Sequence, residues 1–490
     1  MSQDIAAPQS RRFVLVAAIL ASSMGFIDGS VISIAIPAIR ANLGATLPDA
    51  QWVSNGYLLF LSSLILLGGA AGDRFGLRNT FGLGIAVFVA ASLICAMAPT
   101  PLVLIIARAV QGAGAAFMVP GSLAIIAKAY PREERGRAIG IWAAASSLTT
   151  IGGPIIGGFM LTALGEWSWR LVFAINLPLG LVALALLWFR VAPDRPEAGR
   201  RLDVVGAILA TLALMLIAYG LTGDGSEGAP PPSHSIVWCG AGLVSAVAFL
   251  IWEARIAAPM LPLRLFGNLG FSGANGLTFA LYFALGGTIF FLPMTMIGGW
   301  GVSPATVSIA LLPLGLALTA LSSFSGKWAD RFGPGPLIAL GSLIVAGAFA
   351  GLGLTAPMHS VWLAVLPCMV LLGLGMGLVV SPLSTAVMTS VEDGDTGVAS
   401  GVNNAVARVA GLVAVALLGA IVAPVFDAAL GPAAELPIFF GMAAEGLSAQ
   451  EEALRLAATD AAFATVAYVT AALSLVSAAI AWLTLERKSR

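Results

Sequence analysis

Three charged side chains inside long apolar stretches are the residues of this sequence that could do chemistry. Asp28 is the one acidic residue of 24 that falls in the middle of such a stretch, and Arg108 and Arg408 are the two basic residues in comparable positions. An embedded charge is costly, so it usually faces a partner or a cavity and marks an ion or proton path. The pattern predicts a carboxylate that exchanges a proton, with a purely structural Asp28–Arg108 bridge as the alternative.

The remaining chemistry-bearing residues do not form a redox, metal or hydrolytic centre. Cys95, Cys239 and Cys368 lie in apolar stretches without CxxC spacing, and His234 and His359 fall in polar breaks between stretches. No Walker-type GxxxxGK[ST] occurs, so ATP is not the energy source within this chain. We therefore expect no metal, no cofactor and no enzyme activity. The net charge of zero also argues against nucleic-acid binding.

The elements that carry these residues are expected to be membrane-spanning helices. Of the 490 residues, 59% are hydrophobic and 10% are charged, against about 25% charged in soluble domains. Apolar stretches long enough to cross about 30 Å of hydrocarbon recur along the chain. They predict an all-α polytopic membrane protein with fourteen spans, near residues 13–39, 50–71, 79–99, 102–127, 137–163, 169–190, 203–222, 236–254, 269–297, 305–327, 335–355, 361–387, 397–424 and 461–485.

The distribution of basic residues predicts the orientation. An even number of spans puts both termini on one side, and most of the 24 Lys and Arg residues fall in the connections on that side. Only Arg40, Arg170 and Arg455 are expected on the opposite face. By the positive-inside rule both termini are cytoplasmic. We expect a multi-pass protein of the cytoplasmic membrane, in direct contact with the lipid bilayer.

An internal repeat predicts how the spans are grouped. Gly69-x-x-x-Asp73-Arg74-Phe75-Gly76 recurs 257 residues later as Gly326-x-x-x-Asp330-Arg331-Phe332-Gly333. Both copies are expected on the cytoplasmic face, so the repeat is parallel, with an axis along the membrane normal. The predicted units are an N-terminal six-helix bundle (13–190), an inserted and peripheral helix pair (203–254) and a C-terminal six-helix bundle (269–485).

Five short motifs point to a family. In chain order they are Ile27-Asp28-Gly29-Ser30, Gly69 to Arg78, Arg108-x-x-Gln111-Gly112-x-Gly114, Gly153-Pro154-x-x-Gly157-Gly158, and Trp169-Arg170-x-x-Phe173-x-x-Asn176-x-Pro178. Together they resemble the major facilitator superfamily, and within it the fourteen-span drug:proton antiporter branch. The resemblance covers nearly the whole chain and implies the major facilitator fold, two six-helix bundles plus an inserted helix pair.

The resemblance implies a conformational latch at the repeated motif, which would close the cytoplasmic side in the outward-open state. A carboxylate and a guanidinium at a helix end can hydrogen-bond the helix termini and each other. An ordinary positively charged turn is the alternative. The expected latch residues are Gly69, Asp73, Arg74, Gly76, Asp330 and Arg331.

Two further roles come from the resemblance. Gly153, Pro154, Gly157 and Gly158 form the antiporter motif, expected to pack the fifth span against the other half and limit leak, with plain close packing as the alternative. The first and fourth spans are expected at the centre of the N-terminal half. Asp28 and Arg108 would meet there as the proton-coupling pair.

The resemblance also implies which side chains face the centre. Apolar and aromatic walls with a few amides fit a broad lipophilic ligand site, although each residue alone could equally pack in a core or face lipid. The candidates are Asn55, Tyr57, Gln111, Met118, Trp142, Ser146, Asn275, Phe279, Tyr282, Phe283, Asn403, Asn404 and Arg408.

The predicted function is proton-coupled export of lipophilic small molecules by alternating access. The alternative is a transporter of one defined metabolite, lipid or natural product in the same fold. With one carboxylate against two arginines, the cavity favours neutral, weakly acidic or at most monovalent cationic cargo. We expect a monomer whose partners are the cargo and protons; the sequence is compatible with action alone or beside a periplasmic partner.

Overall fold

The computed structural model describes residues 8–194, 202–223, 225, 230–431 and 436–485. Within these ranges the chain forms helices and no β-strand. Fourteen spans in the described part are long and apolar enough to cross a membrane, the number predicted from the sequence. Arg195, Arg200, Arg201, Arg487, Lys488 and Arg490, which contribute to the predicted orientation, lie outside the described residues.

The long helices follow the predicted spans closely, and most extend a few residues beyond them. Span six is divided into α6 and α7. Span fourteen begins at Ala449, earlier than predicted, because Ser448 and Glu451 form a capping box that starts the helix there. The helices are α1 (Pro8–Leu43), α2 (Leu47–Phe75), α3 (Leu77–Ala96), α4 (Pro101–Ala129), α5 (Arg132–Leu164), α6 (Trp169–Ala174), α7 (Asn176–Arg190), α8 (Val204–Thr222), α9 (Pro232–Glu253), α10 (Leu269–Met294), α11 (Pro304–Phe332), α12 (Pro334–Thr355), α13 (Leu366–Thr389), α14 (Thr396–Leu430) and α15 (Ala449–Thr484).

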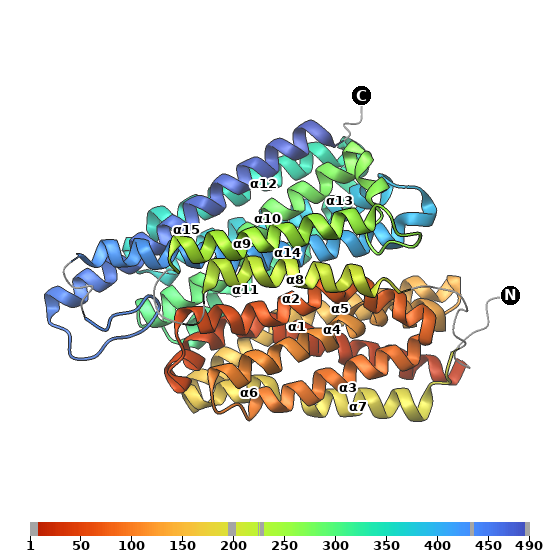
Figure 1. Ribbon diagram of the computed structural model, residues 1–490, viewed down its shortest axis with the longest axis horizontal. Helices are drawn as coiled ribbons and strands as arrows, with labels where there is room; N and C mark the ends of the chain where they lie inside the picture. Colours follow the sequence, from red (N-terminus) through yellow and green to blue (C-terminus); the bar gives the residue numbers. More distant parts are fainter. Residues whose placement is uncertain (1–7, 195–201, 224, 226–229, 432–435, 486–490) are drawn as a thin grey trace.

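The helices form two groups joined by a pair. Helices α1 to α7 pack together, and so do α10 to α15 (Figure 1). Between them, α8 packs on α2 and α14, and α9 packs chiefly on α8. A small apolar cluster of Leu59, Ala218 and Leu412 holds α8 against both groups. The inserted pair therefore covers the outer side of the junction between the bundles.

The sequence repeat is also a structural repeat. Gly76 between α2 and α3 has φ +91°, and Gly333 between α11 and α12 has φ +84°, a region that favours glycine. The guanidinium of Arg74 lies 5.3 Å from the Phe75 ring centre, and that of Arg331 lies 5.3 Å from Phe332. The same turn therefore joins corresponding helices in the two bundles.

The two bundles meet at one end of the molecule. We call the end where α1 begins and α15 ends the terminal end, and the opposite end the distal end. At the distal end Arg40 Nη1 donates to the carbonyl of Phe440 (2.6 Å), and Gln51 Nε2 donates to the carbonyl of Val415 (2.5 Å). One apolar core includes residues of both bundles, whereas a second core, which holds the terminal half of the N-terminal bundle, has buried members from that bundle alone. The bundles diverge toward the termini (Figure 1).

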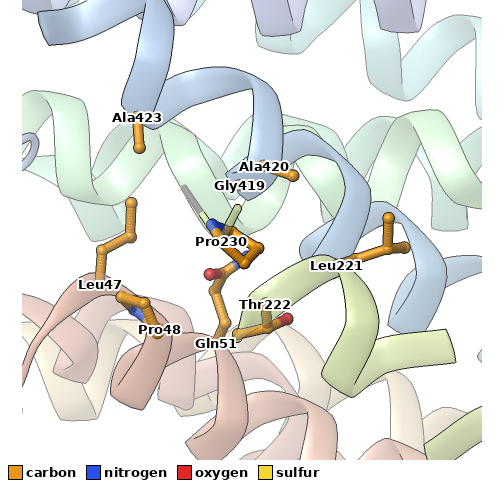
Figure 2. A pocket seen from close by; sticks show the side chains of 9 residues that line it. All are labelled: Leu47, Pro48, Gln51, Leu221, Thr222, Pro230, Gly419, Ala420 and Ala423. Carbon is orange, nitrogen blue, oxygen red and sulfur yellow. The ribbon is translucent and has the colours of Figure 1, made fainter. Parts of the chain in front are cut away.

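A small pocket marks the junction of all three units at the distal end. Figure 2 shows its lining: Leu47, Pro48 and Gln51 from α2, Leu221 and Thr222 from α8, Pro230, and Gly419, Ala420 and Ala423 from α14. Its walls are mostly apolar, and none of its lining residues belongs to the predicted site.

Candidate functional site

An ion pair buried in the N-terminal bundle forms the centre of the site. Asp28 of α1 and Arg108 of α4 are 0% and 1% exposed, and Arg108 Nη1 lies 2.5 Å from Asp28 Oδ2. The structure thus brings together the two residues expected to form the proton-coupling pair. Breaking such a pair by removing one partner leaves an uncompensated buried charge, which costs about 3–5 kcal/mol.

A hydrogen-bond network extends from the pair. Gln111 Nε2 donates to Asp28 Oδ1 (3.0 Å) and to Ser92 Oγ (2.9 Å), and its Oε1 accepts from Arg108 Nη1 (2.7 Å). Asn176 Nδ2 donates to the same Ser92 Oγ (3.3 Å). All five side chains are buried. Both Asp28 oxygens are therefore held by donors, so adding or removing a proton there must rearrange several bonds.

Close helix packing fixes the position of Arg108. A Cβ on Gly112 would overlap the backbone of Tyr57, so this glycine allows α2 and α4 to touch. Arg108 Nε then donates to the carbonyl of Val53 (3.0 Å), and its guanidinium lies 4.4 Å from the Tyr57 ring centre. The arginine thus has a hydrogen-bond acceptor, a carboxylate and an aromatic face, which together neutralise and orient it.

Arg408 links this centre to the C-terminal bundle. It lies on α14, which packs against α2, the helix of Tyr57, and against α10, the helix of Tyr282. Asp28 and Arg108 also interact electrostatically with Tyr57. Tyr57 therefore contacts Arg108 of the ion pair and lies on a helix that packs against α14 of the other bundle.

The other predicted cavity residues fall into several environments. Trp142 Nε1 donates to Ser22 Oγ (2.9 Å), and Asn403 Nδ2 donates to Asn275 Oδ1 (3.3 Å) and Thr278 Oγ1 (2.8 Å). Asn55 and Ser146 are buried, and their side-chain polar atoms have no hydrogen-bond partner within the described chain. Phe279 is 38% exposed, and Asn404 is exposed as well.

Three of the expected cavity residues belong to apolar cores, among them Tyr57, which is 4% exposed. Met118 is 0% exposed and packs toward Gly25 of α1, and Phe283 is 4% exposed. A large apolar side chain on a central helix can line a cavity or pack in the core of the bundle, and the cavity assignment of these residues stays a prediction. The residue type alone does not show whether such a side chain lines a cavity or packs in the core.

The antiporter motif has two faces. Gly153 and Gly157 press against α1, where a Cβ on Gly157 would overlap the side chain of Val31. Gly158 and Pro154 face α11: a Cβ on Gly158 would overlap Ser308 Oγ, and that hydroxyl donates to the Pro154 carbonyl (2.7 Å). The motif therefore packs α5 both within its own bundle and against the other one.

The first copy of the repeated turn, between α2 and α3, is held by a residue that the sequence analysis missed. Asp194, after α7, accepts hydrogen bonds from the backbone N–H of Leu77 (2.7 Å) and Arg78 (3.0 Å) and from Lys128 Nζ (2.8 Å). Burial favours the neutral form of Asp194, but these hydrogen bonds outweigh it, and the net effect lowers the pKa of the carboxyl.

Gly68, rather than Gly69, allows close approach of α2 to α4, because a Cβ added at Gly68 would overlap the Ala116 carbonyl.

Ser92, Asn176 and Arg40 were also not among the predicted site residues. Asn176 lies in the predicted sixth-span motif, so a signal for it existed. A serine inside an apolar stretch, such as Ser92, is common as a packing residue and carries no such signal. Arg40 was placed on the distal face, and its bond across the bundles depends on a loop 400 residues away.

Two helical bundles that meet at one end, with a buried ion pair inside one of them, define a polytopic α-helical membrane transport protein. The chain belongs to the major facilitator superfamily, whose family model matches residues 18–415 and 278–490. The fourteen candidate spans among the described residues agree with the fourteen-span branch.

Curated relatives cover most of the chain. It is 33% identical over 415 residues to the methylenomycin A resistance protein of Bacillus subtilis, covering 84% of this chain and 87% of that protein. It is 31% identical over 419 residues to the tetracenomycin C resistance and export protein of Streptomyces glaucescens, covering 84% and 75%. A bacterial homologue of the human lysosomal transporter Spinster, solved in an inward-facing and unoccupied conformation, shares the fold at TM-score 0.65 and 18% identity, covering 98% of this chain and 97% of that one.

Proposed function

We propose that the protein is a proton-driven exporter of lipophilic small molecules in the cytoplasmic membrane, with both termini in the cytoplasm. The observation that carries the proposal is the fully buried Asp28–Arg108 pair, in which the carboxylate is held by Arg108 and Gln111. Intramembrane carboxylates of this kind mark proton paths. The drug and antibiotic resistance relatives support export as the direction.

In this mechanism a proton arriving at Asp28 removes the negative charge that pairs with Arg108. The bond between Asp28 Oδ2 and Arg108 Nη1 then weakens, and α1 is freed to move relative to α4. Because α1 also packs on α10 of the other bundle and carries Arg40 at its distal end, its movement changes the closed distal contact. The two bundles rock about the centre, and access alternates between the membrane faces.

A second candidate function is export of a single natural product. It is favoured by the curated relatives whose names specify one compound, methylenomycin A or tetracenomycin C. Both candidates use the same fold and proton site. They differ in the range of compounds that the central site accepts.

The experiment is transport into inside-out vesicles with an imposed pH gradient, acid inside. A panel of neutral, anionic and cationic aromatic compounds is offered, and vesicles without the protein provide the background. Accumulation that collapses when a protonophore is added supports proton-driven export. Accumulation of several panel members favours the broad exporter, and accumulation of one favours the natural-product transporter. Uptake that ignores the gradient contradicts both.

A further inference from the structure

The embedded cations differ in how they are neutralised. Arg108 pairs with Asp28, and Arg455 pairs with Glu452 Oε1 (2.7 Å) and donates to the Gly299 carbonyl (2.8 Å). Arg408 has no carboxylate partner within the described residues, and its buried Nε has no hydrogen-bond partner there. The two helices that pack against α14 carry one phenol each, Tyr57 on α2 and Tyr282 on α10.

An uncompensated cation in a low-dielectric site is expensive, and proteins normally pair it. Asp28, the buried carboxylate of the central helices in the described part of the chain, already has Arg108 and Gln111 as donors. The guanidinium of Arg408 can therefore pair with an anionic ligand without displacing a carboxylate of the described chain. Its planar fork suits a carboxylate or phenolate oxygen.

The position of Arg408 suits a ligand that enters from the terminal end, where the bundles diverge. Arg408 lies 12 residues into α14, about 18 Å along the helix from its terminal end. The side chain as a whole remains partly accessible although its Nε is buried.

An amide and an aromatic side chain on α14 and α10 are also available to bind a ligand. Asn404, one turn earlier on α14, and Phe279 on α10 are exposed. The Phe279 ring lies 6.3 Å from the ring of Phe283 on the same helix, so α10 offers an aromatic surface to a ligand. A ligand with an aromatic body and one acidic group would match the ring, the two phenols and the cation.

We propose that Arg408, with Tyr57 and Tyr282, forms an anion-binding subsite, and that the cargo class is monoanionic aromatic amphiphiles. This inference rests on the proposed function and names the cargo of the same site. It predicts that the acidic group of the cargo pairs with Arg408, while Asp28 remains with Arg108.

The test measures binding of three matched fluorescent probes to purified full-length protein in lipid nanodiscs. The probes are 1-pyrenebutyrate, 1-pyrenebutanol and 1-pyrenemethylammonium, which share one aromatic body and differ in charge. The wild-type protein is expected to bind the carboxylate at least about tenfold more tightly than the alcohol, the range of a charge-assisted pair. Arg408→Gln is expected to abolish that preference while changing the alcohol affinity by less than about twofold.

Two further variants keep the test decisive. Arg408→Lys retains charge and should keep part of the preference, which covers the case in which the glutamine variant fails to fold. Arg264→Gln removes an exposed arginine outside the site and should leave all three affinities unchanged. Equal binding of carboxylate and alcohol by the wild type, or an unchanged preference in Arg408→Gln, would overturn the proposal. Binding needs no gradient, so this failure is distinguishable from a loss of proton-driven transport.

Discussion

Arg108 has more contacts than a counter-charge alone would need. It touches the Asp28 carboxylate, the Gln111 amide, the Val53 carbonyl and the Tyr57 ring. We predict that Arg108→Lys lowers the initial transport rate at least about tenfold, because an ammonium keeps the charge but cannot reproduce the planar fork. The rate is measured in proteoliposomes with an imposed pH gradient, with thermal stability as the control for folding. Wild-type rates in the lysine variant would show that charge alone is sufficient.

Residue type and position predicted part of this centre. A lone carboxylate and two arginines in apolar stretches identified Asp28, Arg108 and Arg408, because embedded charges are rare and have few structural uses. The contributions of Ser92 and Asn176 were not predictable, since small polar side chains occur throughout packed spans. The core position of Met118 depends on the rotation of α4 against α1, which hydrophobicity does not specify.

At the scale of elements, Asp194 joins the start of α3 to α4 and to the end of α7. We predict that Asp194→Asn lowers stability at pH 7 by about 1 kcal/mol, because the amide can still cap α3 but lacks the charge that pairs with Lys128 and with the helix N-terminus. Because folding lowers the pKa of Asp194, its stabilisation is present above the unfolded value of about 3.9 and is lost as pH falls through the lower folded pKa. Thermal unfolding of both proteins between pH 7 and pH 3 measures the difference.

The control for Asp194→Asn is Glu133→Gln, which removes an exposed carboxylate from the neighbouring helix α5. The stability gap between wild type and Asp194→Asn should narrow below about pH 4, whereas Glu133→Gln should follow the wild type throughout. A gap that stays constant down to pH 3 would mean that the charge of Asp194 does not contribute.

The α5–α11 contact offers a matched pair of glycines. A Cβ on Gly158 would overlap Ser308 Oγ and the Pro304 carbonyl, whereas a Cβ on Gly152 of the same helix meets nothing within 4 Å. We predict that Gly158→Ala lowers transport several-fold by preventing close contact between the bundles, while Gly152→Ala is neutral or slightly stabilising. Initial rates and melting temperatures of both variants are measured together. Equal effects of the two substitutions would argue against a role for this contact.

Helix positions were the most predictable level of the fold. Apolar stretches alone located fourteen spans, because a helix that crosses a bilayer must be long and hydrophobic. The repeated motif at Asp73 and Asp330 predicted how the spans are grouped. The division of the antiporter motif between α1 and α11 was not predictable. It depends on the rotation of α5 about its axis, which decides whether each glycine faces α1 or α11. The spacing of the glycines alone does not specify that rotation.

At the scale of the whole molecule, the loop around Phe440 holds the distal end closed. Arg40 of α1 is fully buried and donates to the Phe440 carbonyl, while the Phe440 ring packs against Phe291 and Phe426 of the C-terminal bundle. We predict that Arg40→Gln shifts the protein toward distal opening. Spin labels at the exposed positions Leu164 and Met358, in a cysteine-free background, report the distance between the bundles by pulsed electron resonance.

The wild type should give a short and narrow distance distribution at the distal end, and Arg40→Gln a longer and broader one. The control Arg264→Gln should match the wild type, because that side chain is exposed and bonds Asp395 within the C-terminal bundle. An unchanged distribution in Arg40→Gln would show that the bond to Phe440 does not hold the bundles together.

The central claim is that protonation of Asp28 drives transport, and the most direct measurement compares two modes of transport in Asp28→Asn. The amide keeps the shape of the carboxylate but cannot cycle a charge. Uptake driven by a pH gradient is expected to fall to the level seen with protonophore, while exchange of labelled for unlabelled cargo without a gradient is expected to stay within about threefold of wild type. Gradient-driven uptake at the wild-type rate in Asp28→Asn would contradict it.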